Sequence, residues 1–317
     1  MTSMPQPARL SIIIVNWNVR PLLHACLAAL AADPGCAAWE VIVVDNASSD
    51  DSAAMVRDTF PFSTLLESPV NLGFAEGCQL GYARSMGDAI LLLNPDTEVP
   101  AGAIATMLAD LAAHPTAAIL GSRLVTADGQ VQRSAGGAFP TLGNVAWNYL
   151  FLYRLLPDRL GPAAVFIRHD PRHITPIDWV SGAAMMFRRE AVGPCIFDPG
   201  YFMFGEDMAL CARMRREGWQ VLYSGRQTIV HHHGQSYRKQ VSMDVLATIY
   251  RGPRTFFRVT HSARQALAYD AILLVGYLLR WCIAGVLSVL RPGGGYGDIA
   301  RFSRSYVGLI LRSLRTR

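Results

Sequence analysis

The chain has 317 residues, 51% of them apolar, which suits two ordinary domains or one large α/β domain with an appendage and excludes disorder for most of its length. Charged residues make up only 17%, against roughly 25% in an average soluble protein, so the chain is unusually apolar for a purely cytosolic one. The charges are also uneven: residues 1–250 contain 18 Lys or Arg and 22 Asp or Glu, whereas residues 251–317 contain 11 Arg and 2 Asp, so a mildly acidic body precedes a basic segment.

The six cysteines are dispersed and form no C-x-x-C pair. This spacing argues against a zinc knuckle or a disulfide framework and favours a reducing compartment. Near the N-terminus, Pro5 and Pro7 interrupt the stretch where a signal peptide needs an unbroken apolar segment. We therefore predict that the body of the protein is not exported.

From Leu10 onward, short apolar runs alternate with helix-length amphipathic stretches, as in βαβ units around a mainly parallel sheet. The predicted strands are 11–15, 41–44 and 89–93, and the predicted helices are 21–32, 51–59, 72–85 and 101–114. Each strand is followed by polar residues, among them Asn16, then Asp45 and Asn46, then Asn94 and Asp96. Ligands of open α/β sheets bind at the carboxyl ends of the strands, so we expect these side chains at one edge.

The second half of the body is less regular. Residues 132–175 have no clean period and indicate a loop-bearing insertion, followed by a strand at 179–187 and a helix at 206–218 that ends at Gly218. Two short strands are predicted at 220–222 and 228–230. A boundary after residue 240 separates the α/β body, 1–240, from a helical extension, 241–317.

Several clusters in the body admit both a structural and a functional interpretation. The polar run from Asp45 can cap the next helix or can bind a base or ribose. Gly73, Gly77 and Gly81 share one helix face, where they allow close approach of a ligand or, more simply, tight packing on the sheet. No G-x-G-x-x-G occurs, which argues against a nicotinamide or flavin enzyme.

Three acidic residues are candidates for chemistry. Asp96, in Asn94-Pro95-Asp96, can hold Mg²⁺ or Mn²⁺ together with phosphate oxygens, although the same residues also suit a turn. Glu206 and Asp207 begin a helix, where they suit the helix dipole. An apolar surround would raise the pKa of one of them into the range of a general base, and because adjacent helical residues point about 100° apart, only one can face a reacting hydroxyl.

Three consecutive histidines, 231–233, end a predicted strand. Strand alternation places His231 and His233 on one face and His232 on the other, which makes a three-histidine metal site poor in geometry. One histidine at the edge can instead join Asp96 at a cation or contact a phosphate.

Taken in order, these motifs resemble glycosyltransferase family 2, whose members have the GT-A fold. The resemblance rests on six segments within about 230 residues: 11–18, 41–50, 71–74, 94–96, 179–183 and 205–207. Arg213 and the pattern His231-x-x-Gly234-x-Ser236 are similar to a branch that includes bacterial rhamnosyltransferases. Many family members have Asp-x-Asp where this chain has Asn94-Pro95-Asp96, so strict metal dependence stays open.

The resemblance implies an inverting hexosyltransferase of polysaccharide or cell-envelope biosynthesis that uses a nucleotide diphosphate sugar. It implies Asp207 as the general base, with Glu206 binding sugar hydroxyls, and Asp96 with His231 as ligands of Mg²⁺ or Mn²⁺. Trp179, Ser181 and Gly182 would line the sugar or acceptor pocket. The implied donor-binding residues are Asn16, Asp45, Asn46, Asn71, Gly73, Asn94 and Asp96. Rhamnose from a dTDP donor is the first expectation, ahead of UDP-linked glucose, galactose or N-acetylglucosamine.

The extension after residue 251 contains an apolar helix at 268–290, interrupted by Arg280, then a break at 292–295 and a basic amphipathic helix at 298–317. The apolar stretch is about long enough to span a bilayer, but a charge at its centre costs about 2.5–3.5 kcal/mol, so we favour a helix lying in the interface. The basic helix suits an anionic cytoplasmic leaflet. These features predict a protein on the cytoplasmic face of the inner membrane, peripheral or C-terminally anchored, with a glycan or lipid-linked acceptor. The alternative is that both helices pack on the body or on a second copy in a homodimer.

Three other functions have less support from the sequence. A nucleotidyltransferase needs a Gly/Arg/Lys-rich loop after the first strand, which this chain lacks. A non-catalytic sugar-binding scaffold of the same fold has no reason to keep Asp96, Glu206 and Asp207 together. A nucleic-acid binder would need an aromatic stacking platform beside its arginines, so we predict no nucleic-acid partner.

Overall fold

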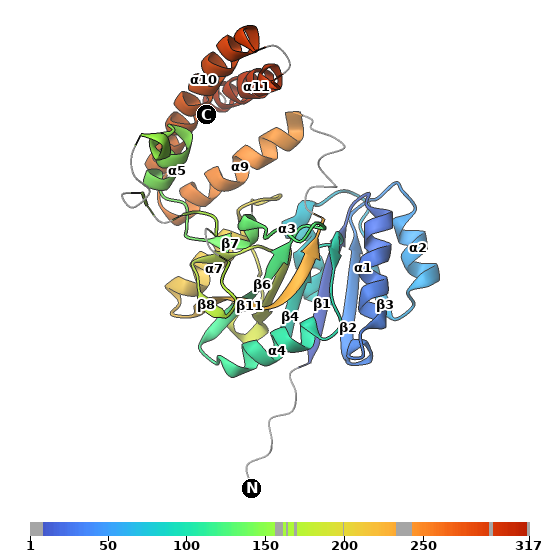
Figure 1. The fold of residues 1–317 in the computed structure, drawn as a ribbon. Coiled ribbons are helices and arrows are strands. Elements are labelled where there is room, and N and C mark those ends of the chain that lie inside the picture. Colours follow the sequence, from blue (N-terminus) through green and yellow to red (C-terminus); the bar gives the residue numbers. More distant parts are fainter. Residues whose placement is uncertain are drawn as a thin grey trace. The chain divides into compact units, whose positions relative to one another are not determined.

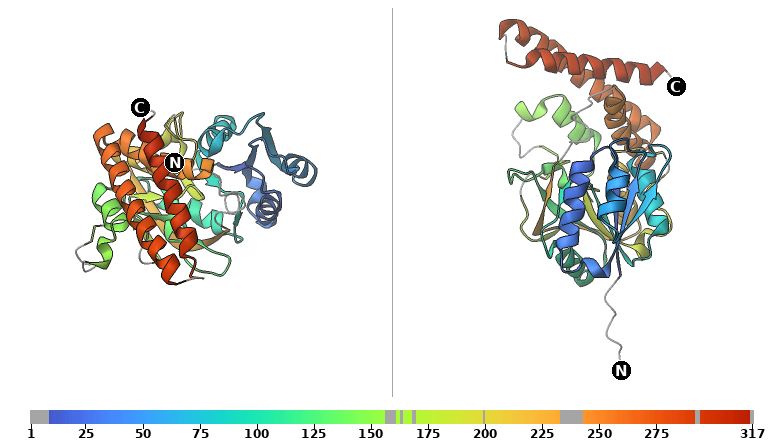
Figure 2. Two further views of the ribbon diagram at one scale, coloured as in Figure 1. Left: turned by 90° about the horizontal axis from the view of Figure 1, so that it is seen from above. Right: turned by 90° about the vertical axis from the view of Figure 1, so that its right-hand side faces the viewer.

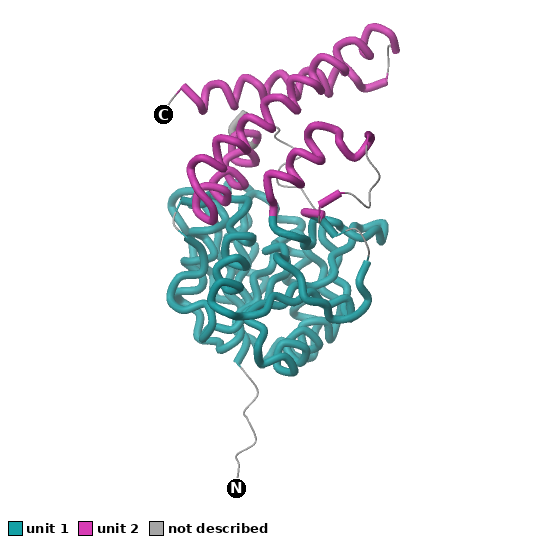
Figure 3. The backbone as a smooth tube through the Cα atoms, turned by 90° about the vertical axis from the view of Figure 1, so that its left-hand side faces the viewer, with its two compact units in different colours: residues 1–139, 166–240 teal, residues 140–165, 241–317 magenta. Residues whose placement is uncertain are grey.

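A computed structural model describes residues 9–155, 161–162, 164–167, 170–198, 200–232, 243–291 and 294–315 (Figure 1). The chain divides into two compact units (Figure 3). Unit 1 comprises Met1–Phe139 and Phe166–Gln240, and unit 2 comprises Pro140–Val165 and Val241–Arg317. Part of the predicted insertion therefore belongs to the same unit as the C-terminal helices.

Unit 1 is built on a nine-stranded sheet. Its first four strands are β1 (Leu10–Asn16), β2 (Trp39–Asp45), β3 (Ser63–Glu67) and β4 (Ala89–Leu93). They lie in the order β3-β2-β1-β4, and every pairing among them is parallel. The buried β-branched and leucine residues of β1, β2 and β4 form the centre of the core. The prediction of a parallel sheet is confirmed for this half.

The other half of the sheet is mixed. Its strands are β10 (Ala184–Arg188), β6 (Ala117–Val125), β11 (Gln220–His231), β5 (Thr97–Glu98) and β8 (Ile174–Pro176). Strand β10 lies antiparallel between β4 and β6, whereas β11 is parallel to β6 and antiparallel to β5 and β8. The chain enters β10 directly from a two-stranded sheet of β7 (Gly136–Gly137) and β9 (Trp179–Val180), without the crossover helix that a parallel strand requires.

Five helices of unit 1 begin and end close to the predicted positions: α1 (Arg20–Ala32), α2 (Ser52–Thr59), α3 (Gly73–Arg84), α4 (Ala103–Ala113) and α7 (Glu206–Arg216). The short helix α6 (Arg189–Val192) and the 3₁₀ turns η1 (Cys36–Ala38) and η2 (Arg133–Ala135) were not predicted. The predicted strand 179–187 is divided at Ser181 and Gly182, and the two short strands predicted at 220–222 and 228–230 form one strand with a register shift after Ser224. Strand β3 escaped prediction because its residues are only partly buried and do not alternate.

Helix α3 packs tightly on the sheet. A Cβ atom at Gly77 would lie 2.8 Å from Cγ1 of Val15, and one at Gly81 would lie 2.5 Å from Cγ2 of Ile13. Both distances are too short for a side chain, so these two glycines let the helix backbone approach β1. The packing interpretation is correct for Gly77 and Gly81.

Unit 2 is helical. Its elements are α5 (Leu142–Tyr149), η3 (Leu152–Arg154), α9 (Met243–Thr260), α10 (Ala263–Leu290) and α11 (Tyr296–Arg315). Helix α10 contacts α5, α9 and α11, and it lies beside α11 (Figure 2). The shared core contains Tyr250, Phe257, Leu273, Tyr306 and Ile310. Helices α5 and α9 were not predicted, and the predicted positions Pro292, Gly293 and Arg317 lie outside the described residues.

Two charged residues of α10, Asp270 and Arg280, are engaged within unit 2. Arg280 donates to the carbonyl oxygens of Tyr149 (2.6 Å) and Asn148 (3.1 Å) at the C-terminus of α5, and its guanidinium lies 4.3 Å from the ring centroid of Phe151. This is the favourable end of a helix dipole for a cation. Asp270, which is buried, accepts from Arg254 over 3.0 Å.

Among the described residues, α10 is the helix whose length and apolar composition suit a membrane span. Its most apolar window has a mean hydropathy of 2.0, and 22% of that window is buried. A large share of its apolar surface is therefore left exposed by unit 2.

Candidate active site

The loops that follow β1 and β2 are joined by buried polar side chains. Asn16 donates from Nδ2 to Oδ1 of Asp45 and to Oγ of Ser48, both over 3.0 Å. The other carboxylate oxygen of Asp45 accepts from the backbone N–H of Ser48 over 3.0 Å. Asp45 thus stabilises the loop before α2 rather than the helix N-terminus, and Asn16 is fully buried behind it.

Asn46 connects the end of β2 to the start of α3. Its Nδ2 donates to Oδ1 of Asn71 (3.0 Å) and to the carbonyl of Gly73 (2.9 Å), and its Oδ1 accepts from the N–H of Leu72 over 2.8 Å. Three hydrogen bonds of one buried amide therefore fix the turn that contains Asn71 and Gly73.

Gly73 also fixes the loop in front of α7. It has φ +80°, and a Cβ atom there would lie 2.5 Å from the carbonyl oxygen of Phe202. That same oxygen accepts from the N–H of Phe74 over 2.8 Å. The close approach that Gly73 permits in this structure is to Phe202, whose loop precedes Glu206 and Asp207.

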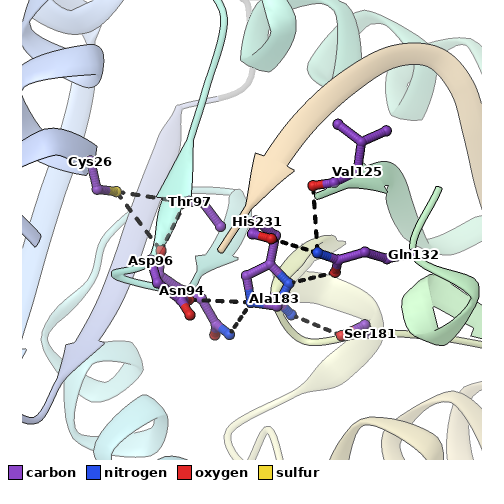
Figure 4. Close-up of polar contacts among 9 residues, drawn as sticks. All are labelled: Cys26, Asn94, Asp96, Thr97, Val125, Gln132, Ser181, Ala183 and His231. Atoms are coloured by element: carbon purple, nitrogen blue, oxygen red, sulfur yellow. Dashed lines mark hydrogen bonds and ion pairs between the residues drawn. The ribbon is translucent and has the colours of Figure 1, made fainter. Parts of the chain in front are cut away.

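The polar residues after β4 meet the end of β11 (Figure 4). Nε2 of His231 lies 3.2 Å from Oδ1 of Asp96 and 3.3 Å from Nδ2 of Asn94. His231 and Asp96 are both buried, with exposed fractions of 5% and 6%. The structure therefore brings together the two predicted cation ligands, from positions 135 residues apart in the chain.

A residue that the sequence did not indicate lies behind His231. Gln132 donates from Nε2 to the backbone carbonyl of His231 over 2.5 Å, and its Oε1 is 2.8 Å from Nδ1 of the same ring (Figure 4). Gln132 is buried and follows β6 in a stretch without periodicity, so neither pattern nor motif pointed to it.

The neighbouring histidines point elsewhere or are not described. Nε2 of His232 lies 2.6 Å from Oε1 of Glu98, away from Asp96, as strand alternation predicts. His233, Gly234 and Ser236, which carried part of the resemblance, lie outside the described residues. Within the described part of the chain, no three His, Cys, Asp or Glu side chains form a group that could hold a metal ion by themselves.

The loop between β9 and β10 contacts both the edge at Asn94 and the N-terminus of α7. The carbonyl of Ala183 accepts from the N–H of Asn94 over 2.9 Å, and Oγ of Ser181 accepts from the N–H of Ala183 over 3.3 Å. The N–H of Gly182 donates to Oδ2 of Asp207 over 3.3 Å. Three consecutive residues thus join the Asp96 edge to the candidate base.

Trp179, which was predicted to line the pocket, is buried. Its Nε1 donates to the carbonyl of Ala138 over 3.1 Å, and Phe166 packs edge-on against the ring. The Trp179 side chain is therefore held by Ala138 and Phe166, and its place in the sugar or acceptor pocket stays a prediction.

Glu206 and Asp207 have different environments at the start of α7. Burial raises the pKa of Glu206 well above its usual range, and the nearby Asp207 adds to the effect. Oε2 of Glu206 has no hydrogen-bond partner among the residues that the structure describes. Burial also raises the pKa of Asp207, to about 6, against the opposing effect of N–H donors from Met208 and Gly182. Burial thus favours the neutral form of Glu206, whereas Asp207 is mostly ionised at pH 7 and retains the basicity of a group that titrates near neutrality.

In comparison with known proteins, the matching family model and the matching relative are both glycosyltransferases. A family model described as Glycosyl transferase family 2 matches residues 11–174. The N-acetylglucosaminyl-diphospho-decaprenol L-rhamnosyltransferase of Mycobacterium tuberculosis is 26% identical over 300 residues, which cover 88% of this chain and 91% of that protein.

Two solved structures are similar in fold. The mannosyltransferase PcManGT from Pyrobaculum calidifontis, in complex with GDP-Man and Mn²⁺, has a TM-score of 0.53 at 16% identity, over 98% of this chain and 88% of that one. GalNAc-T7 with UDP, GalNAc and Mn²⁺ has a TM-score of 0.58 at 14% identity, over 95% of this chain and 55% of that one.

Proposed function

Because the chain belongs to glycosyl transferase family 2 and has the GT-A fold, we propose that it transfers a sugar from a nucleotide diphosphate donor to an acceptor hydroxyl with inversion at the anomeric carbon. The observation that carries the proposal is the 181–183 loop, which contacts Asn94 on one side and Asp207 on the other. Inversion requires the base and the leaving diphosphate on opposite faces of one sugar, and this loop is hydrogen-bonded to both sides of the proposed site.

Asp207 is the proposed base. Its carboxylate accepts the proton of the acceptor hydroxyl as the oxygen attacks the anomeric carbon and the bond to the donor diphosphate breaks. A pKa near 6 suits this role, because the group is ionised at neutral pH and still basic. Burial and the neighbouring Asp207 both favour the protonated form of Glu206, which disfavours a second negative charge beside the base, and its Oε2, which has no partner among the described residues, can accept a hydrogen bond from one sugar hydroxyl.

Asp96 and His231 are the proposed protein ligands of Mg²⁺ or Mn²⁺. A buried carboxylate oxygen 3.2 Å from an imidazole nitrogen fits a hard divalent cation that takes its remaining ligands from diphosphate oxygens and water. When bound, the cation supplies positive charge that stabilises the leaving diphosphate. Asn94 contributes an amide N–H at the same edge.

The donor nucleotide would lie along the edge formed by the ends of β1, β2 and β4. Asp45, Asn71 and Gly73 are the proposed contacts to the base and ribose. Asn16 and Asn46 donate hydrogen bonds to Asp45 and to Gly73, so we propose that these two act by holding the loops in place.

The curated relative suggests the substrates. Its name describes an L-rhamnosyl donor and an N-acetylglucosaminyl-diphospho-decaprenol acceptor. We propose L-rhamnose from a dTDP donor, transferred to a polyprenol-linked sugar diphosphate in envelope polysaccharide synthesis. Such an acceptor has its reactive sugar at the surface of a membrane.

Unit 2 would bring the enzyme to that surface. Exposed apolar side chains recur every three or four residues along the second half of α10, at Val275, Leu279, Ile283, Val286 and Val289. Exposed arginines lie on α11 at positions 301, 304, 312 and 315. An apolar face with flanking arginines favours binding to an anionic leaflet, and Arg280 is already engaged at the end of α5, so we propose an interfacial helix on the cytoplasmic face of the inner membrane.

A panel of nucleotide sugars tests the function. The expected result is thermal stabilisation and slow hydrolysis of one donor, first of all dTDP-L-rhamnose, that increases with Mn²⁺ or Mg²⁺. Transfer to a synthetic polyprenyl diphosphate N-acetylglucosamine then tests the acceptor. Absence of binding to every nucleotide sugar, with and without cation, would refute the proposal.

A further inference from the structure

The heavy-atom partners of Gln132 determine which nitrogen of the His231 ring carries a proton. Its Nε2 lies 2.5 Å from the backbone carbonyl of His231 and 3.5 Å from that of Val125. Carbonyl oxygens only accept, so the amide nitrogen must face them and the amide oxygen must face Nδ1 of His231. Nδ1 therefore carries a proton and donates it to Oε1 of Gln132 over 2.8 Å.

The proton on Nδ1 also determines what the other ring nitrogen, Nε2, can bind. Nε2 faces Oδ1 of Asp96 at 3.2 Å and Nδ2 of Asn94 at 3.3 Å (Figure 4). In the tautomer with its proton on Nδ1, the ring has its lone pair on Nε2, so a cation beside Asp96 can take Nε2 and Oδ1 as ligands together.

We propose that Gln132 is a positioning residue, which holds the His231 ring in the Nδ1-protonated tautomer so that Nε2 faces Asp96 at the donor diphosphate. The proposal rests on the proposed function for its ligand, a divalent cation with a nucleoside diphosphate. Gln132 binds both the ring and the backbone carbonyl of the same histidine, so it fixes the rotation of the ring and the position of the strand end together. Residues that donate to or accept from the second nitrogen of a metal-binding histidine commonly have this effect.

The test compares Gln132→Met, which removes both hydrogen bonds at similar volume, with Gln132→Glu, which keeps an acceptor for Nδ1. Gln130→Met is the matched control, because Gln130 is exposed two residues away. All variants are made in the full-length chain. Gln132→Asn, whose shorter amide cannot reach both partners, replaces Gln132→Met if that variant does not fold.

Two measurements are made. The ¹⁵N shifts of the His231 ring, assigned by their absence in His231→Ala, report which nitrogen carries the proton. Electron paramagnetic resonance of free Mn²⁺ in the presence of dTDP or UDP gives the cation affinity. We expect the Nδ1 proton in wild type, Gln130→Met and Gln132→Glu, and loss of this preference in Gln132→Met together with about 10- to 100-fold weaker Mn²⁺ binding.

Retention of the Nδ1 proton in Gln132→Met, or of wild-type Mn²⁺ affinity, overturns the proposal. If the wild-type chain binds no Mn²⁺ with either nucleotide and transfers no sugar, the proposed function fails. The ring measurement still decides the proposal in that case, since loss of the Nδ1 preference in Gln132→Met supports the hold on the ring independently of catalysis.

Discussion

The backbone N–H of Gly182 donates to Oδ2 of Asp207 over 3.3 Å, while the N–H of Met208 donates to Oδ1 over 2.7 Å. Both donors favour the ionised carboxylate, and burial opposes them by raising the pKa of Asp207 to about 6. The loop that contains Gly182 thus lowers the pKa of a side chain on a different element and so favours its ionised form.

The first prediction concerns pH. The value of kcat/KM for sugar transfer is expected to rise with pH and to reach half its maximum near pH 6, because Asp207 must lose its proton before it can act as the base. The measurement is a rate profile between about pH 4.5 and 8.5 at saturating cation, with protein stability checked at each pH. A profile that is flat across the acidic half would rule out this assignment.

The second prediction concerns Asp207→Asn. We expect kcat to fall about 10²- to 10⁴-fold, because the amide cannot accept the proton, while the donor dissociation constant measured by calorimetry stays close to that of wild type. Glu217→Gln, an exposed carboxylate just past the end of α7, is the matched control and should retain activity. Loss of donor binding together with activity would argue for a binding role instead.

The third prediction uses the same substitution as a stability probe. The pKa of Asp207 is raised in the folded state, so its stabilising contribution is complete below the unfolded value of about 3.8 and is lost as pH rises through about 6. Asparagine does not titrate. The Tm of Asp207→Asn relative to wild type should therefore increase between pH 4 and pH 8, and an unchanged difference would mean that the carboxylate is not desolvated.

The fourth prediction compares two glycines with nearly equal backbone angles. Gly73 has φ +80° and Gly102 has φ +79°, but a Cβ atom at Gly73 would lie 2.5 Å from the carbonyl of Phe202, whereas nothing lies within 4 Å at Gly102. Gly102→Ala should reduce the free energy of unfolding by about 1–2 kcal/mol, the cost of the backbone conformation alone. Gly73→Ala should cost clearly more in denaturant unfolding and should also weaken donor binding, and equal costs would contradict the contact with Phe202.

The fifth prediction concerns the membrane. Val286→Glu with Val289→Glu on α10 should reduce co-sedimentation with vesicles that contain anionic lipid, because both side chains are exposed and apolar. Arg304→Glu with Arg312→Glu should also reduce co-sedimentation, and by more at low salt than at high salt, because salt screens the attraction between the arginines and the anionic lipid. Leu80→Glu and Arg84→Glu, exposed positions on α3, are the controls and should bind as wild type does.

The sequence was sufficient for the parts of the fold that follow local rules. The runs ending at Asn16, Asp45 and Leu93 were predicted as strands because buried β-branched and leucine residues are recognisable without context, and the glycines of α3 were recognisable as sites of close approach. The position of Asp96 at the carboxyl-end edge of the sheet could be predicted from strand direction alone.

The contacts that complete the site depend on tertiary structure. Gln132 acts on His231, 99 residues later, through a side-chain amide whose neighbours in sequence have no period. Trp179 was predicted to lie in the pocket, and its burial follows from packing with Phe166 across an irregular segment. The reversal of β10 likewise depends on β9, since no local pattern specifies strand direction.

The pairing of α5 with α10 has a consequence for synthesis of the chain. Arg280 binds the carbonyl of Tyr149 from 131 residues further along, so α5 leaves the ribosome on the order of ten seconds before its partner exists, at about 5–20 residues per second. During that interval the apolar side of α5 needs temporary cover, by nascent neighbours or by a chaperone. A chain shortened at residue 240 would keep that exposure permanently, so the C-terminal helices cannot be removed as a dispensable tail when the catalytic unit is produced by itself.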